Sequence, residues 1–332
     1  TLLALYMLKK LSKSGEYTHM LIILALLAIY FFTPAVDFTM LVSTNDIAPA
    51  GMWIQEYVVL VPLLGKLVNI LLIVLIISQL NSIGIRTEII PRRSFITSSL
   101  LVALLLFSPV EAYFTKALFI MLLLVYGYAN TMSMFGKQYP YTQVLNASIA
   151  ISLSSMILPH TILFIFFIWL AFFTYSVNSW REWFISIIGL VIPYIYLAFA
   201  YFWNDNLIYF IDIYKTFFSN PDFTIAMPSM YLMITFCLII IVYFAVMLPF
   251  INNASDKVIS VRKRMWLTFQ FSFIAIIVIA TSGSSFFIIL PVLFAPMALM
   301  LSYNIHDQKR SRVYDVLFSL LLISILINRI IV

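Results

Sequence analysis

The sequence predicts an all-α, polytopic helical membrane protein in which residues 1–332 form a single integral membrane domain. Hydrophobic residues make up 64% of the chain and charged residues 10%, whereas soluble domains contain about 45–50% and about 25% respectively. The apolar residues lie in runs of about 18 to 25 residues, long enough to cross a hydrocarbon core of about 30 Å. These observations exclude a soluble enzyme, a secreted disulfide scaffold and a nucleic-acid-binding domain.

Eleven transmembrane helices are predicted from the apolar runs and the polar residues that separate them. The third and fifth are short, and the fifth and sixth share the Pro159-His160 break, so this pair could instead be one tight hairpin that does not fully cross twice. The predicted spans are 18–35, 59–80, 95–109, 116–134, 143–158, 160–177, 184–203, 229–249, 265–281, 286–303 and 314–331.

The distribution of basic residues orients these spans. Cytoplasmic loops of membrane proteins carry an excess of Lys and Arg, and a cytoplasmic N-terminus places 15 of the 19 basic residues inside. The four on the outer side are Lys66, Lys116, Lys215 and Arg329. We therefore expect the N-terminus inside and the C-terminus outside. The net charge of +6 is then an orientation signal and does not indicate a nucleic-acid partner.

Three further segments complete the predicted topology. Residues 1–17 form a cytoplasmic segment without a cleavable signal, because the first apolar run follows Lys13 and lacks a small-residue cleavage site. Residues 36–58 and 204–228 form outer interfacial loops. Within the second loop, the apolar spacing over 207–218 predicts a helix that lies flat at headgroup level.

Charged residues near the outer face are the candidates for chemistry, since charge within a membrane usually marks a site or pathway. Lys66 either extends outward to the headgroups or faces an outward cavity, where it could bind a carboxylate or a lipid phosphate. Arg329, near the outer end of the last span, has the same two interpretations. In the first outer loop, Asp37 and Asp46 are either solvated carboxylates or candidates for a catalytic base.

Motifs of soluble enzymes are absent from the sequence. It contains no Gly-rich phosphate loop, His-Glu-x-x-His pair, Cys-x-x-Cys pair or Gly-x-Ser-x-Gly turn. His19, His160 and His306 belong to different segments, and the predicted topology separates His160 from the other two. We therefore expect no metal site and no cofactor. Cys237 is the single cysteine, which excludes a disulfide framework.

Two groups of residues carry a resemblance to a known family. One is the Arg92-Arg93-Ser94 loop that follows the second span, and the other is Trp-Arg-Glu-Trp-Phe-Ile-Ser-Ile-Ile-Gly-Leu-Val-Ile-Pro-Tyr over residues 180–194. With the short hairpins between them, residues 67–203 resemble an uncharacterised family of multi-pass inner-membrane proteins of Bacteroidota. The resemblance implies the bacterial inner membrane and supplies no activity.

A looser resemblance rests on the order of features along the chain. An acidic outer loop precedes short hairpins, then the Leu158-Pro159-His160 break, and then the inner turn of residues 180–183. In this order the first seven spans resemble membrane glycosyltransferases of the GT-C type. That resemblance implies a polyprenyl-phosphate-linked sugar as substrate. This chain departs from the pattern in its short first outer loop, which lacks an adjacent acidic pair, and no soluble C-terminal domain is expected after the last span.

Three functions stay open from the sequence. The first is a membrane subunit or scaffold of a cell-envelope complex, with other envelope proteins as partners. The second is a GT-C-like transferase at the outer face, in which Asp37 or Asp46 is the base and Lys66 and His160 bind the carrier phosphate. The third is a transporter or lipid-handling protein, because Ser282–Ser285, Pro291 and Pro296 interrupt the late spans. Membrane lipids are expected partners in each case.

Overall fold

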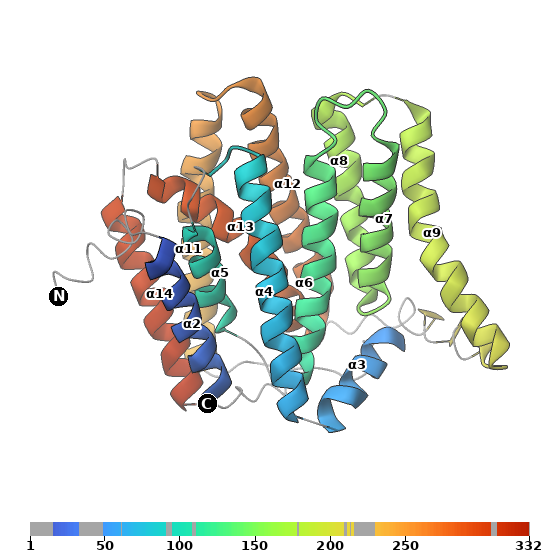
Figure 1. Ribbon diagram of the computed structural model, residues 1–332, viewed down its shortest axis with the longest axis horizontal. Coiled ribbons are helices and arrows are strands. Elements are labelled where there is room, and N and C mark those ends of the chain that lie inside the picture. Colours follow the sequence, from blue (N-terminus) through green and yellow to red (C-terminus); the bar gives the residue numbers. More distant parts are fainter. Residues whose placement is uncertain are drawn as a thin grey trace.

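The regular structure of the chain is helical throughout the part that the structure describes. The computed structural model describes residues 16–32, 49–60, 62–90, 95–107, 111–177, 179–208, 211–212, 214–215, 230–306 and 311–331, and no strand occurs among them. Most helices run side by side along one common direction, so that their ends form two opposite faces of a bundle (Figure 1).

Each predicted span overlaps a helix of the structure. The long helices are α2 (Glu16–Phe32), α4 (Pro62–Arg86), α6 (Glu111–Met132), α9 (Trp180–Trp203), α11 (Met230–Ala254), α12 (Ile259–Thr281), α13 (Phe286–His306) and α14 (Ser311–Ile331). The shorter elements are α3 (Pro49–Leu60), α5 (Ile96–Leu105), α7 (Tyr141–Ser155), α8 (Ile165–Tyr175) and the 3₁₀ turns η4 (Pro159–Phe164) and η5 (Gly283–Ser285).

The chain is an integral membrane protein of the helical class. Within the described residues, six helices are long and apolar enough to cross a membrane, namely α4, α6, α9, α11, α12 and α13. Four apolar helices are shorter, among them Ile96–Leu105, which at 1.5 Å per residue is about 15 Å long. That is about half of the hydrocarbon thickness, so the crossing number of eleven stays a prediction.

The two outer loops differ in how much of them the structure describes. The last part of the first loop, from residue 49 onward, belongs to α3, which lies obliquely across one end of the bundle and packs on α4 and α6 (Figure 1). In the second loop, the described positions 207–208, 211–212 and 214–215 are helical, in line with the expected helix there. Residues 33–48 and 216–229 lie outside the described residues.

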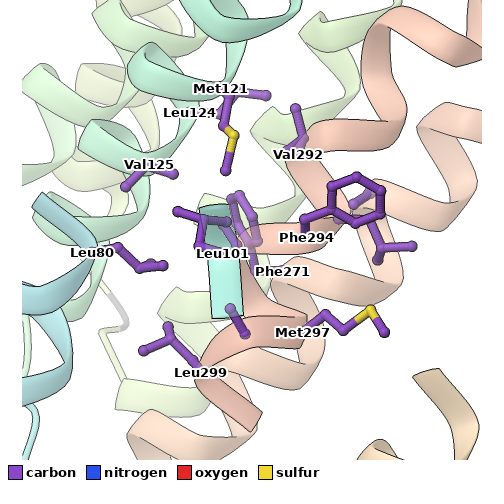
Figure 2. Close-up of a cluster of buried hydrophobic side chains, with 14 of the residues drawn as sticks. Leu80, Leu101, Met121, Leu124, Val125, Phe271, Val292, Phe294, Met297 and Leu299 are labelled. Atoms are coloured by element: carbon purple, nitrogen blue, oxygen red, sulfur yellow. The ribbon is translucent and has the colours of Figure 1, made fainter. Parts of the chain in front are cut away.

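The core of the bundle is built around α13. From Phe287 to Ile305 all residues of α13 are buried, and all are hydrophobic except Ser302 and Asn304 near its C-terminal end. This helix packs against α5, α6, α11 and α12. Figure 2 shows side chains of α4, α5, α6 and α12 gathered on Val292, Phe294, Met297 and Leu299. Like α13, α5 is buried along its whole length, whereas α4, α9 and α11 bury at most 33% of their apolar stretches and are left to face lipid.

Neighbouring helices are also joined by hydrogen bonds from polar side chains, which hold transmembrane helices together where the hydrophobic effect is absent. The Tyr128 and Thr268 hydroxyls lie 2.8 Å apart between α6 and α12. Between α7 and α9, the Ser152 hydroxyl donates to the Leu190 carbonyl at 2.7 Å. Pro193 in the same helix lacks the N–H that would bond to the Gly189 carbonyl, so the contact from Ser152 lies one residue from the point where the hydrogen bonding of α9 is interrupted.

Candidate functional site

A polar cavity opens where the end of α4, the end of α6 and the beginning of α12 meet. Its volume is about 450 Å³, within the usual range for small-molecule sites, roughly 300–1,000 Å³. The side chains that give it polar character are Gln79, Ser82, Arg86, Asn130, Ser133 and Arg264. Polar groups from three helices therefore converge on one space at the basic end of the bundle.

Helical spacing explains why these residues converge. Gln79, Ser82 and Arg86 follow one another at intervals of three and four in the last turns of α4, so they share one face of that helix. Asn130 and Ser133 have the same spacing at the end of α6. Both polar faces belong to the lining of the cavity, and α12 adds Arg264 to it.

The Arg264 guanidinium is held in a fixed position by two contacts. Its Nη1 donates a hydrogen bond to the Thr87 carbonyl at 3.3 Å, and its central carbon lies 5.4 Å from the centre of the Phe135 ring. Its Nε is buried and has no hydrogen-bond partner among the described residues. A guanidinium has five N–H donors in a planar fork, so the bond to Thr87 leaves most of this donor capacity for another partner.

The electrostatic character of the cavity is positive. Arg86 and Arg264 line it, and no Asp or Glu belongs to its described lining. Arg86 is solvent-exposed, whereas Arg264 is half-buried. Two guanidinium groups without a carboxylate between them favour an anion, and the planar fork matches the oxygens of a phosphate or a carboxylate.

The structure places Lys66 in a different setting, beside the C-terminal end of α2. Its Nζ donates to the Phe31 carbonyl at 3.2 Å and lies 5.8 Å from the Phe31 ring centre. The last carbonyls of a helix lack intrahelical partners, and a cation there interacts favourably with the helix dipole. This contact gives Lys66 a structural role that neither interpretation of the sequence included.

The other residues proposed from the sequence do not gather around Lys66 in the described structure. His160 is half-buried in η4, which packs against α7, α8 and α12, whereas Lys66 belongs to the α2–α4 contact. Arg329 belongs to α14, and its side chain lies outside the described part. Asp37 and Asp46 lie outside the described residues. The expected outward site therefore stays a prediction.

Sequence reasoning missed the cavity because it counted Arg86 and Arg264 among the inner basic residues that orient the spans. The usable signal was the polar face formed by Gln79, Ser82 and Arg86, which interrupts an otherwise apolar helix. Among the described residues, no group of three or more His, Cys, Asp or Glu could hold a metal ion.

Comparisons with known proteins add no relative to this picture. No family model, no curated protein and no solved structure matches the chain. The resemblances to the Bacteroidota family and to GT-C glycosyltransferases stay predictions, and any function has to be argued from the cavity.

Proposed function

We propose that the chain is a lipid-handling membrane protein that binds a phosphate-bearing anion in the cavity between α4, α6 and α12. The observation that carries the proposal is the fixed guanidinium of Arg264, which has donors to spare and faces a cavity without acidic residues. Charge-assisted bonds from Arg to phosphate are about twice as strong as neutral hydrogen bonds, and they are often bidentate.

Preorganisation strengthens this argument. A free arginine side chain loses about 2 kcal/mol of rotamer entropy when it is fixed. Arg264 has already lost much of that freedom, because the Thr87 carbonyl and the Phe135 ring hold its head group before any ligand is present. The entropy of fixing this side chain is therefore lost when the bundle folds and not when the ligand binds, which favours binding.

The proposal includes the predicted orientation. Arg86, Arg264 and the neighbouring Arg262 and Lys263 all lie at one end of the bundle, where α4 ends and α12 begins. The positive-inside rule assigns such an end to the cytoplasm, so the cavity is proposed to open at the cytoplasmic side of a bacterial inner membrane.

Thermal unfolding in a neutral detergent tests this function. Glycerol 3-phosphate is titrated against sodium chloride at matched ionic strength, for the unmodified protein, Arg264→Gln and Arg262→Gln. A ligand at ten times its Kd stabilises the folded state by about 1.4 kcal/mol. We expect this shift in the unmodified protein and in Arg262→Gln, whose altered residue does not line the cavity, and its loss in Arg264→Gln. Equal shifts in all three proteins would refute the proposal.

A second candidate function, that of a membrane subunit, is favoured by α9. This helix stands at one edge of the bundle and packs mainly on α7 (Figure 1). Only 17% of its apolar stretch is buried, and Ile188, Ile195 and Phe199 are exposed. Cysteine crosslinking from Ile195→Cys, in a Cys237→Ser background, tests this role in native membranes. A discrete crosslinked protein is expected for a subunit, and lipid-exposed α9 would yield none.

A further inference from the structure

The exposed face of α4 changes character along its length. In the first half of the helix this face is apolar, with Leu67, Leu71 and Val74 each about half exposed. Towards the end it becomes polar, with Ser78 and Arg86 exposed and Ser82 half-buried. The spacing of these residues keeps them on one side of the helix. An apolar surface therefore leads along α4 directly into the polar cavity.

The cavity also extends from the end of the bundle towards its middle. Gln79 and Arg86 both line it, and their separation of seven positions along the helix corresponds to about 10 Å. On α6, Tyr126 borders the cavity. Its side chain is 42% exposed, whereas the neighbouring residues Val125 and Gly127 are buried. The cavity is thus accessible from the side of the bundle that faces the membrane as well as from its end.

Resting on the proposed function, we infer that the occupant is an anionic phospholipid of the inner leaflet, which enters sideways between α4 and α6. Its phosphate lies between Arg86 and Arg264, and its acyl chains lie along Leu71 and Val74. The buried Oε1 of Gln79 has no donor among the described residues. A hydroxyl of the headgroup supplies that donor, so the site selects a headgroup that carries both a negative charge and hydroxyl groups.

A soluble phosphate ester would use only part of this surface. It would contact the arginines and leave the apolar face of α4 without a role, whereas the acyl chains of a lipid lie along that face. In a membrane the chains are already in an apolar medium, so their contribution here is one of shape and confinement. The charge of the headgroup is what distinguishes this lipid from its neighbours.

Native mass spectrometry tests the inference on the whole protein in neutral detergent. The protein is equilibrated with equal amounts of dioleoyl phosphatidylglycerol and a dioleoyl digalactosyl glycerolipid, which has hydroxyls and no phosphate. We expect one phosphatidylglycerol to be retained in preference to the glycolipid. Loss of one charge-assisted contact lowers retention roughly tenfold or more. We expect such a loss in Arg264→Gln and in Arg86→Gln, and none in Arg262→Gln. Arg86 is exposed, so we expect Arg86→Gln to fold. This variant therefore tests the inference even if Arg264→Gln does not fold.

A second variant pair separates the lipid from a soluble anion. Replacing Leu71 and Val74 by Asn should lower lipid retention and leave the stabilisation by glycerol 3-phosphate unchanged. The matched control replaces Ile187 and Ile188, equally exposed on α9, and should change neither quantity. Stabilisation by glycerol 3-phosphate that depends on Arg264, without preferential retention of phosphatidylglycerol, would overturn the lipid inference and leave the proposed function standing. If the unmodified protein shows neither preferential retention of phosphatidylglycerol nor stabilisation by glycerol 3-phosphate, the lipid inference and the proposed function are both overturned.

Discussion

The contact between α7 and α9 leaves no room for a side chain at Gly189, which makes Gly189→Ala a sharp test of the packing. A Cβ at this position would lie 2.7 Å from the Cβ of Ser148 and 3.1 Å from the Leu145 carbonyl oxygen. Carbon atoms pack best at about 3.5–4.0 Å, so the two helices would have to separate by close to an ångström. Separation on that scale would also stretch the 2.7 Å bond from Ser152 to Leu190.

The expected cost follows from these two effects. Overpacking of a close-packed core costs about 1–3 kcal/mol, and a hydrogen bond between transmembrane helices contributes about 0.6 kcal/mol on average. We expect Gly189→Ala to lower the free energy of unfolding by about 2 kcal/mol, measured by steric trapping in bicelles.

Two comparisons make this prediction specific. Gly127→Ala on α6 is the matched control, since its Cβ would meet its nearest neighbours at 3.5 Å and beyond, which is ordinary contact. That variant should be neutral or slightly more stable, because Ala favours a helix over Gly by up to about 1 kcal/mol. Adding Ser148→Gly to Gly189→Ala removes the clashing Cβ and should restore most of the loss. A Gly189→Ala protein as stable as the unmodified one would refute the close approach of these helices.

Three other predictions follow from contacts elsewhere in the bundle. Lys66→Met should destabilise the fold by about 1 kcal/mol in thermal unfolding, because a cation at the end of α2 is lost. Lys66→Arg should retain most of that stability. A Lys66→Met protein as stable as the unmodified one would contradict the capping role. Thr235→Val should cost about 1–2 kcal/mol, because it leaves the Asn328 amide without its hydroxyl partner between α11 and α14; unchanged unfolding would show that this bond is not formed in the membrane. A thiol at Ser260→Cys, in a Cys237→Ser background, should react only with reagents that enter the cytoplasm, and labelling from outside in intact cells would reverse the orientation.

The membrane class and the approximate positions of the helices could be predicted from the sequence, because a span must be apolar over enough residues to cross the hydrocarbon. The identity of the central helix could not. In α13, 94% of the apolar stretch is buried, and in α11 only 33% is. Lipid chains and a protein interior are both apolar, so the two environments select similar side chains and leave similar patterns in the sequence.

The cavity could be predicted only in fragments. Gln79, Ser82 and Arg86 reveal a polar face of α4 by their spacing, but the role of Arg264 depends on a contact with Thr87, which is 177 residues away in the chain. A basic residue near the cytoplasmic end of a span has the same sequence context whether it faces headgroups or a cavity. The contact between Lys66 and the end of α2 also joins residues that are 35 positions apart in the chain, so the sequence could not show it.

Electron cryomicroscopy of the protein in phosphatidylglycerol nanodiscs tests the central claim, anion binding by Arg264, most directly. Charge-assisted bonds from a guanidinium to a phosphate are about 2.7–2.9 Å long. The account predicts phosphate density at that distance from Arg264, between it and Arg86, and no such density in Arg264→Gln. A cavity filled by side chains of the protein, or occupied only by acyl chains with no phosphate near Arg264, would contradict it.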